Sequence, residues 1–291
     1  MTAPLTQAAA KLRALLESGE IVQMPAVFDP LSARLVQEAG FAATFMSGFA
    51  VSAARLGLPD TGLISYGEIL DQGRNICAAV SIPVLGDADT GYGNAVNVKR
   101  TVRGYAQAGF ACAMIEDQIW PKRCGHTRGK QVVERVEALA RIRAAVDARA
   151  EGADILVMAR TDARATDGLE EALWRAKAFA ELGADIVFVE APRDEAEMAR
   201  VCAEVPAPLM ANMVEGGDTP VLPPKRLEEL GYRIAAYPLT LLSAAMKAME
   251  QALSEMAAGR HPDALLKDFA ALREAVGFED YYRDEERYGG G

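Results

Sequence analysis

Eight short apolar runs, each separated from the next by an amphipathic stretch, constrain the fold of this chain more than any other feature of its sequence. Near-continuous apolar runs of this length are typical of strands that are buried on both faces. They lie at 21–26, 42–47, 82–89, 111–117, 154–161, 184–190, 208–213 and 232–238. The stretches between them have helical spacing, and several end in glycine just before the next run, as helix C-termini do. This alternation predicts a parallel sheet covered by helices.

Eight such units in 291 residues match a (β/α)8 barrel, which typically takes about 250 residues. An open, doubly wound sheet is the alternative, but no G-x-G-x-x-G motif follows any of the runs. Additional helices are predicted before the first run (5–19) and after the eighth (241–259 and 263–277). We therefore expect one barrel domain over 1–291, with an N-terminal helix within 1–20 and a helical extension over 259–291.

The charge of the chain limits its partners. Lysine and arginine total 31 against 41 acidic residues, which gives a net charge of −10 and argues against nucleic acid or an anionic membrane as a partner. An anionic substrate would then need a local cationic feature. No secretory signal and no apolar run of about 18–20 residues is recognisable, so a cytoplasmic location is expected. The four cysteines form no C-x-x-C pair, which argues against a zinc or redox motif.

Polar residues end most of the predicted strands. In a barrel of this kind the active site lies at the C-terminal ends of the strands. A single polar residue there is typical of a solvated strand end, but the whole set in register predicts one shared site. Its members are Ser47, Gly48, Asp87, Asp89, Glu116, Asp117, Arg160, Thr161, Asp162, Glu190 and Asn212.

The pair Asp87 and Asp89 indicates a cation site. Side chains two positions apart lie on the same side of an extended chain, and Glu116 ends the next strand. Clustered carboxylates repel one another unless a cation lies between them. Oxygen ligands without a nearby histidine suit Mg²⁺ or Mn²⁺ better than zinc. A hydrogen-bonded acidic turn is the alternative.

A long polar segment, 118–134, follows the fourth strand. It contains Cys124, surrounded by the cationic or titratable residues Lys122, Arg123, His126, Arg128 and Lys130. Loops of this length are commonly functional. Its cations would lower the pKa of the thiol or hold an anionic substrate. A solvated loop with an incidental cysteine is the alternative.

These motifs add up to a family resemblance over essentially the whole chain. The matching segments are 46–62, 86–94, 115–126, 159–163, 188–192 and 212–217. They resemble the isocitrate lyase/phosphoenolpyruvate mutase superfamily, and the K-R-C-G-H element at 122–126 resembles the catalytic loop of its carbon–carbon lyase branch. Mutase and oxaloacetate decarboxylase branches lack that cysteine.

Within the lyase branch, the segments SGFAVSAA, CGHTRGKQV, FVEAP and NMVEGG look most like the 2,3-dimethylmalate lyase and petal death protein group. Members of that group cleave 2-alkylmalates, and some hydrolyse oxaloacetate. Phe49 stands where methylisocitrate lyases tend to have glycine, and Phe45 stands where tyrosine is expected. A phosphonomutase of the same superfamily is a minor alternative.

The resemblance implies a Mg²⁺-dependent, retro-aldol cleavage of a 2-hydroxy di- or tricarboxylate to a 2-oxo acid and a carboxylic acid. It makes Cys124 the general acid, with Arg160 and Glu116 as further catalytic residues. Asp60, Asp87, Asp89 and Glu116 would hold the metal. The substrate would be bound by Arg160 together with Ser47, Gly48, Phe49, Gly125, His126, Glu190 and Asn212.

The resemblance also implies a homotetramer in which the last barrel helix is exchanged between subunits, and the apolar run 241–256 is compatible with that exchange. Two other functions stay open. A non-catalytic metabolite-binding protein is less favoured, because a decayed site would lose its charged residues. An oxaloacetate hydrolase is separated from a lyase only by its products.

Overall fold

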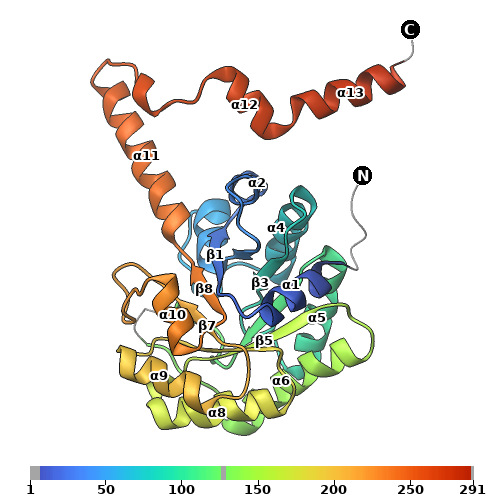
Figure 1. Ribbon diagram of the computed structural model, residues 1–291, viewed down its shortest axis with the longest axis vertical. Helices are drawn as coiled ribbons and strands as arrows, with labels where there is room; N and C mark the ends of the chain where they lie inside the picture. The colour runs from blue at the N-terminus through green and yellow to red at the C-terminus, as the bar shows by residue number, and fades with distance from the viewer. Residues whose placement is uncertain (1–6, 126–128, 290–291) are drawn as a thin grey trace. The chain divides into compact units, whose positions relative to one another are not determined.

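The computed structural model describes residues 7–125 and 129–289 and contains eight parallel strands wound into a barrel (Figure 1). In order around the barrel, the first six strands are neighbours in sequence order, and β8 and β7 follow β1 on its other side. The strands are β1 (Val22–Val27), β2 (Thr44–Met46), β3 (Val84–Asp87), β4 (Cys112–Glu116), β5 (Leu156–Thr161), β6 (Ile186–Val189), β7 (Met210–Asn212) and β8 (Ile234–Tyr237). All eight predicted strands are thus present.

The seam between β6 and β7 is closed by a short parallel bridge. Val187 pairs with Leu209 there, and the backbone N–H of Val187 donates to the carbonyl of Pro208 at 2.9 Å. Because the last strand pair is joined in this way, the sheet has no long open edge. The predicted (β/α)8 barrel is confirmed, and the open, doubly wound alternative was wrong.

Helices follow the strands and cover the outside of the barrel (Figure 1). The barrel unit contains α1 (Ala8–Glu17), α2 (Pro30–Glu38), α3 (Gly48–Val51), the π-helix η2 (Ser52–Leu56), α4 (Tyr66–Ala79), α5 (Ala95–Ala108), α6 (Arg135–Ala150), α7 (Ala163–Thr166), α8 (Leu169–Glu181), α9 (Glu195–Glu204) and α10 (Pro224–Leu230). The short helices α3, η2 and α7 were not predicted, because each is too short to display a helical period.

Local sequence sets where the covering helices begin and end. α4 begins at a capping box, in which Ser65 and Glu68 each accept the other's backbone N–H. α5 begins at a similar box made by Asn94 and Asn97, and it ends at Gly109, whose φ of +98° is in the left-handed region. The chain therefore enters β4 directly after the helix.

The acidic pair after β3 departs from the prediction. The strand ends at Asp87, and Asp89 has a φ of +48°. The two carboxylates are therefore not neighbours on one face of an extended strand, because the chain has already turned. Asp87 Oδ1 instead accepts a hydrogen bond from the backbone N–H of Asp89 at 3.0 Å.

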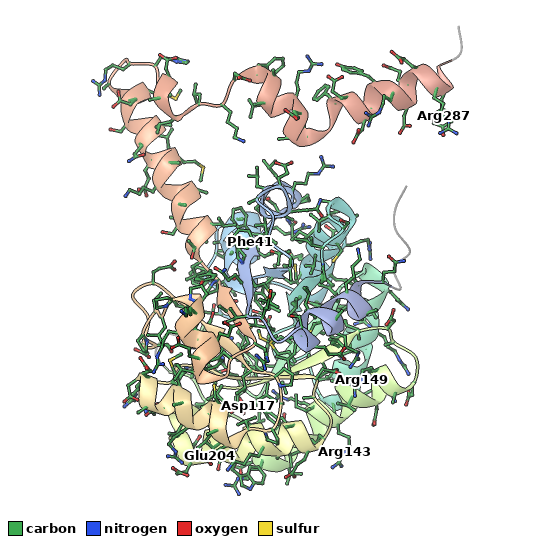
Figure 2. All side chains as sticks on the ribbon, viewed as in Figure 1. Phe41, Asp117, Arg143, Arg149, Glu204 and Arg287 are labelled. Atoms are coloured by element: carbon green, nitrogen blue, oxygen red, sulfur yellow. The ribbon has the colours of Figure 1, made fainter. Side chains whose placement is uncertain are left out.

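The interior of the barrel is apolar, and α1 covers one end of it. Leu12 and Leu16 of α1 pack with strand residues such as Met24, Leu85 and Ile234 in one buried cluster. Figure 2 shows the side chains on the ribbon, with exposed Arg143 on a covering helix and Asp117 buried beside the strands. α1 packs at the N-terminal ends of the strands. An active site can therefore open only at the opposite, C-terminal ends.

The chain divides into two compact units, residues 1–240 and residues 241–291. The second unit contains most of α11 (Thr240–Ala257), the 3₁₀ turn η3 (Asp263–Leu265), α12 (Phe269–Val276) and α13 (Phe278–Tyr288). None of these helices has a buried residue. Within the described ranges, no helix is both long and apolar enough to cross a membrane.

Candidate active site

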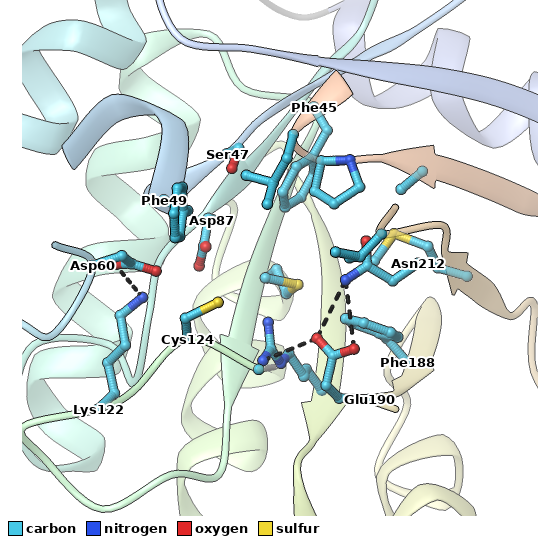
Figure 3. A pocket seen from close by; sticks show the side chains of 18 of the residues that line it. Phe45, Ser47, Phe49, Asp60, Asp87, Lys122, Cys124, Phe188, Glu190 and Asn212 are labelled. Atoms are coloured by element: carbon cyan, nitrogen blue, oxygen red, sulfur yellow. Dashed lines mark hydrogen bonds and ion pairs between the residues drawn. The ribbon is translucent and has the colours of Figure 1, made fainter. Parts of the chain in front are cut away.

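A pocket opens at the C-terminal ends of the strands (Figure 3). Ser47 follows β2, Asp87 ends β3, Arg160 is near the end of β5, Glu190 follows β6 and Asn212 ends β7. These residues are far apart in sequence, and the barrel brings them to one place. The lining consists of Phe45, Ser47, Phe49, Asp60, Asp87, Met114, Lys122, Arg123, Cys124, Gly125, Arg160, Phe188, Glu190, Met210, Asn212, Val214, Ala236, Pro238 and Leu239.

Lys122 lies among the carboxylates on one side of the pocket. Its Nζ is 2.6 Å from Asp60 Oδ1 and 2.8 Å from Asp89 Oδ1, and its side chain is only 3% exposed. Burial opposes the charged ammonium, but Asp89 and Asp60 outweigh it and raise the pKa of Lys122 well above its ordinary value. The lysine thus stays charged and balances part of the acidic charge.

One lysine does not balance the whole acidic cluster. Burial, and then repulsion by Asp89, raise the pKa of Asp87 to about 6. Burial also raises the pKa of Glu116, and among the described residues Glu116 Oε1 has no hydrogen-bond partner. The cluster therefore has oxygen donors and too little positive charge, which suits a divalent cation. Over the described ranges, however, no three acidic, histidine or cysteine side chains already converge in metal-binding geometry.

Arg160 is held from several sides by acids. Its Nε and Nη2 donate to the two carboxylate oxygens of Asp162 at 2.8 and 3.0 Å, and Nη2 is 3.1 Å from Glu190 Oε2. Nε is also 3.4 Å from Glu116 Oε2. These contacts use the Nε–Nη2 edge of the guanidinium, so its orientation in the pocket is fixed by the protein.

The segment that carries Cys124 approaches this arginine closely. Figure 3 shows the sulfur of Cys124 directed into the pocket. The next residue, Gly125, is buried, and a Cβ there would lie 2.4 Å from Glu190 Oε2 and 2.6 Å from Arg160 Nη2. Only glycine fits without moving those groups. Behind the segment, the side chain of Gln118 bonds the backbone N–H and the carbonyl of Arg123, each at 2.9 Å.

The turn after β2 forms another wall. Ser47 caps α3, and its Oγ accepts the backbone N–H of Ala50 at 3.2 Å. The N–H of Gly48 points at Asp87 Oδ2, 3.3 Å away, and a Cβ on Gly48 would lie 2.7 Å from that oxygen. The chain therefore needs a glycine where this turn meets the acidic cluster.

Most of the residues predicted from the sequence lie together. Gly48, Asp89 and Glu116 do not line the pocket, but each contacts a residue that does, namely Asp87, Lys122 and Arg160. Asn212 Nδ2 lies 3.3 Å from Glu190 Oε2. His126 lies outside the described residues.

Sequence reasoning missed several residues at the site. Lys122 and Lys130 were noted only as loop cations, and Asp162 only as a strand end. The apolar part of the wall, formed by Met114, Phe188, Met210, Val214 and Leu239, was also missed. These apolar residues carry no signal in the sequence, because they look the same as the core residues of their strands.

Comparison with known proteins identifies the class. The family model for phosphoenolpyruvate phosphomutase matches residues 12–257. A 2,3-dimethylmalate lyase from Eubacterium barkeri is 47% identical over 241 residues, which are 83% of each chain. The petal death protein of Dianthus caryophyllus is 40% identical over 99% of this chain and 91% of its own length.

Solved structures agree with this. An oxaloacetate acetylhydrolase in complex with 3,3-difluorooxalacetate superposes with a TM-score of 0.93, at 37% identity and with 98% of each chain covered. Phosphonopyruvate hydrolase, in complex with oxalate and Mg²⁺, has a TM-score of 0.86 at 31% identity, over 97% of this chain and 99% of its own.

The chain therefore belongs to the isocitrate lyase/phosphoenolpyruvate mutase superfamily, as its motifs indicated. It is an enzyme of that superfamily, and its relatives named as lyases support a carbon–carbon lyase.

Proposed function

We propose that this protein is a Mg²⁺-dependent lyase that cleaves a 2-hydroxy di- or tricarboxylate of the 2-alkylmalate, 2,3-dimethylmalate or 2-methylisocitrate type. The products are a 2-oxo acid and a carboxylic acid. The observation that carries the proposal is the lining of one pocket. The Cys124 thiol, the Arg160 guanidinium and the carboxylates of Asp60 and Asp87 lie together there. A proton donor, an anion-binding group and cation ligands are the groups that such a cleavage needs.

Asp87 and Asp89, with Asp60 and Glu116 through water, are the proposed Mg²⁺ ligands. The elevated pKa of Asp87 supports this set, as does Glu116 Oε1, which has no hydrogen-bond partner in the described part of the chain. When bound, Mg²⁺ would supply positive charge to the 2-hydroxyl and its neighbouring carboxylate, which favours loss of the hydroxyl proton.

Residues of the chain bind the substrate and donate the proton. Arg160 binds the carboxylate of the oxo-acid part, using the Nη1 side that its contacts with Asp162 and Glu190 leave over. A base takes the proton of the 2-hydroxyl. The C2–C3 bond then breaks, the C2 oxygen becomes the carbonyl of the 2-oxo acid, and the electron pair of the broken bond passes to C3 as the enolate of the leaving acid. Cys124 donates its thiol proton to that carbon. Ser47, Phe49, Gly125, Glu190 and Asn212 line the pocket, and Gly48 contacts Asp87 beside it. These residues are the proposed substrate-binding residues, and His126 is proposed as a further one.

The apolar part of the lining supports an alkylated substrate. Met210, Val214 and Leu239 are aliphatic, and Phe45 and Phe188 add aromatic faces. Each alkyl carbon buried against such a wall contributes about 0.8 kcal/mol to binding. A malate that carries methyl groups would therefore bind more tightly than malate itself.

An oxaloacetate hydrolase is the second candidate, supported by the oxaloacetate acetylhydrolase structure that superposes along almost the whole chain. The two activities differ in products. The lyase releases a 2-oxo acid and a carboxylic acid from a 2-hydroxy acid, whereas the hydrolase adds water to oxaloacetate and releases oxalate and acetate.

We further propose a homotetramer with exchanged α11 helices. On α11, Met246, Met249, Leu253 and Met256 recur at helical spacing and are 49–63% exposed. A helix with such an apolar face is stable in water only when another surface covers it. A neighbouring subunit would supply that cover.

The test is a substrate panel. Purified protein is offered 2,3-dimethylmalate, 2-methylisocitrate, isocitrate and oxaloacetate with Mg²⁺, and the products are identified by mass spectrometry. We expect 2-oxo acid from an alkylated malate and no turnover after treatment with EDTA, with activity restored by added Mg²⁺. A folded protein that turns over none of these compounds contradicts the proposal, and oxalate from oxaloacetate alone selects the hydrolase.

The role of Cys124 is tested by Cys124→Ser, with Cys202→Ser as the matched control. Loss of the general acid is expected to lower kcat by about 10²- to 10⁴-fold. Binding of oxalate with Mg²⁺, measured by calorimetry, should stay unchanged, because the serine retains the shape of the pocket. Full turnover by Cys124→Ser would remove Cys124 from the acid role.

A further inference from the structure

Lys130 places a buried ammonium beside the active site. Its side chain is 5% exposed, and its Nζ is 3.1 Å from Asp162 Oδ1. The same Nζ also donates to the carbonyl oxygen of Gly125. Lysine is seldom buried to this extent unless it is paired, because removing an ammonium from water is costly. The burial of the Lys130 ammonium therefore depends on these two partners, Asp162 and the Gly125 carbonyl.

Both partners of Lys130 belong to the site. Gly125 follows Cys124 directly, so the carbonyl that Lys130 holds is one residue from the thiol. Asp162 is the residue that orients Arg160, through hydrogen bonds of 2.8 and 3.0 Å to Nε and Nη2. One carboxylate thus contacts both the lysine that holds the Cys124 segment and the arginine of the pocket.

Asp162 is itself held firmly. Its side chain is fully buried, and its backbone N–H donates to Asp117 Oδ1 at 2.9 Å. Asp117 Oδ2 accepts from Thr161 Oγ1 at 2.7 Å and is paired with Arg175 of α8 at 3.1 Å. Burial favours the neutral form of Asp162, but Arg160 and Lys130 outweigh it and lower its pKa. The anchor is therefore a charged carboxylate at the end of β5.

From this geometry we infer that Lys130 is a positioning residue for Cys124: its ammonium ties the Gly125 carbonyl to Asp162 and so sets the thiol's place relative to Arg160. The inference rests on the proposed function, because it takes Cys124 as the proton donor. Without Lys130, Asp162 still has both hydrogen bonds to Arg160, whereas the Gly125 carbonyl loses the ammonium that holds it. Removing Lys130 should therefore impair proton donation without impairing binding of the oxo-acid part.

The kinetic test compares Lys130→Met, Lys130→Arg and the control Lys177→Met, which removes a lysine paired with Glu204 on the outer helices. Lys130→Met should lower kcat by about 10- to 100-fold, the effect of a reacting group displaced by about 1 Å. KM and the affinity for oxalate with Mg²⁺ should change by less than about threefold, because Arg160 keeps its contacts with Asp162 and Glu190. Lys130→Arg should recover most of the lost kcat, since it keeps a cation of similar reach, and Lys177→Met should match the wild type.

A double-mutant cycle identifies the group through which Lys130 acts. In a Cys124→Ser background, Lys130→Met should cost nothing further, because the thiol that it positions is already absent. A second loss of 10-fold or more in that background would overturn the inference. So would an unchanged kcat in Lys130→Met, or a loss that falls on KM and oxalate binding instead.

An assay without substrate separates this inference from the proposed function. Alkylation of Cys124 by iodoacetamide is followed over pH, so that the limiting rate of the thiolate is separated from the thiol pKa. The limiting rate should rise severalfold in Lys130→Met, because Lys130 no longer ties the segment that carries the thiol to Asp162. It should stay unchanged in Lys177→Met. If no substrate is turned over but this rate rises, only the proposed function fails. If the rate is unchanged while the wild type is active, the positioning role fails.

Discussion

Gly125 is the residue where a single added carbon has the clearest consequence for the site. A Cβ there would lie 2.4 Å from Glu190 Oε2 and 2.6 Å from Arg160 Nη2. Contacts this short force either the glycine segment or the two side chains to move. The Cys124 segment and the arginine would then shift apart.

We therefore expect Gly125→Ala to lower kcat by about 100-fold, because a displacement of about 1 Å is enough for such a loss. The thermal unfolding midpoint should fall by only a few degrees, since the change is local. Steady-state kinetics and a thermal scan measure the two effects. A variant with wild-type kcat would show that the pocket adapts to the added methyl group.

Cys124 lines the pocket, whereas Cys77, Cys112 and Cys202 are not among its lining residues. Burial raises the pKa of Cys77 and of Cys202 to about 12, and it raises the pKa of Cys112 well above its ordinary value. A raised pKa means a smaller thiolate fraction at pH 8, and the thiolate is the form that reacts with alkylating reagents. These three thiols should be nearly inert in the folded protein.

Iodoacetamide at pH 8 should therefore modify Cys124 first, because its thiol lines the pocket and the other three thiols are nearly inert. Peptide mass spectrometry of the native protein gives the rate at each site, and urea-unfolded protein, in which all four cysteines react, is the control. Labelling of Cys77 or Cys202 at a rate close to that of Cys124 is the result that speaks against this prediction.

At the scale of elements, the packing of α4 against the barrel depends on one glycine. A Cβ on Gly73 would lie 2.2 Å from Phe110 Cζ and 3.3 Å from Met46 Sδ. Phe110 has no room to move, because its ring is buried and stacked on Tyr105 with centroids 4.5 Å apart. α4 can therefore lie this close to the start of β4 only because residue 73 is a glycine.

Two glycines of α4 give a matched comparison. Gly73→Ala should destabilise the protein by about 1–3 kcal/mol through overpacking, although alanine is the better helix former. Gly67→Ala, where the nearest atom would be 4.0 Å away, should stabilise it by about 0.5–1 kcal/mol. Urea unfolding of both variants measures the difference. Equal effects at the two positions would mean that α4 does not pack as described.

At the scale of the whole molecule, α11 offers its apolar side chains to solvent. Met246, Met249, Leu253 and Met256 are all exposed. If subunits exchange this helix, these side chains are covered in the assembly and not in the single chain. The sequence of the helix specifies an apolar face but not the chain that covers it.

If the proposed homotetramer forms, light scattering should give a mass about four times that of the 31.1 kDa chain. Leu253→Asp should dissociate the assembly into smaller species, because it places a charge on the apolar face. Ser254→Asp, which adds the same charge at the neighbouring polar position, should leave the mass unchanged. A monomeric wild type at micromolar concentration would remove the exchanged helix from the description.

The eight strands, the covering helices and most of the polar residues that line the pocket could be predicted from the sequence. The reason is that hydrophobic periodicity and capping residues are local, and the C-terminal ends of barrel strands converge whatever the loops do. Ser47, Asp87, Arg160, Glu190 and Asn212 were found in this way. The same reasoning failed at Asp89, where a left-handed φ replaced the assumed extended chain.

Which buried charged groups neutralise one another could be seen only in the folded barrel. Lys122 between Asp60 and Asp89, and Lys130 between Gly125 and Asp162, depend on distances across elements that no local pattern encodes. The aliphatic wall of the pocket was likewise hidden among ordinary core residues. Hydrophobic periodicity and helix caps depend on residues that are neighbours in the sequence. The pairing of buried charges, in contrast, is fixed only when the barrel closes and brings distant strand ends together.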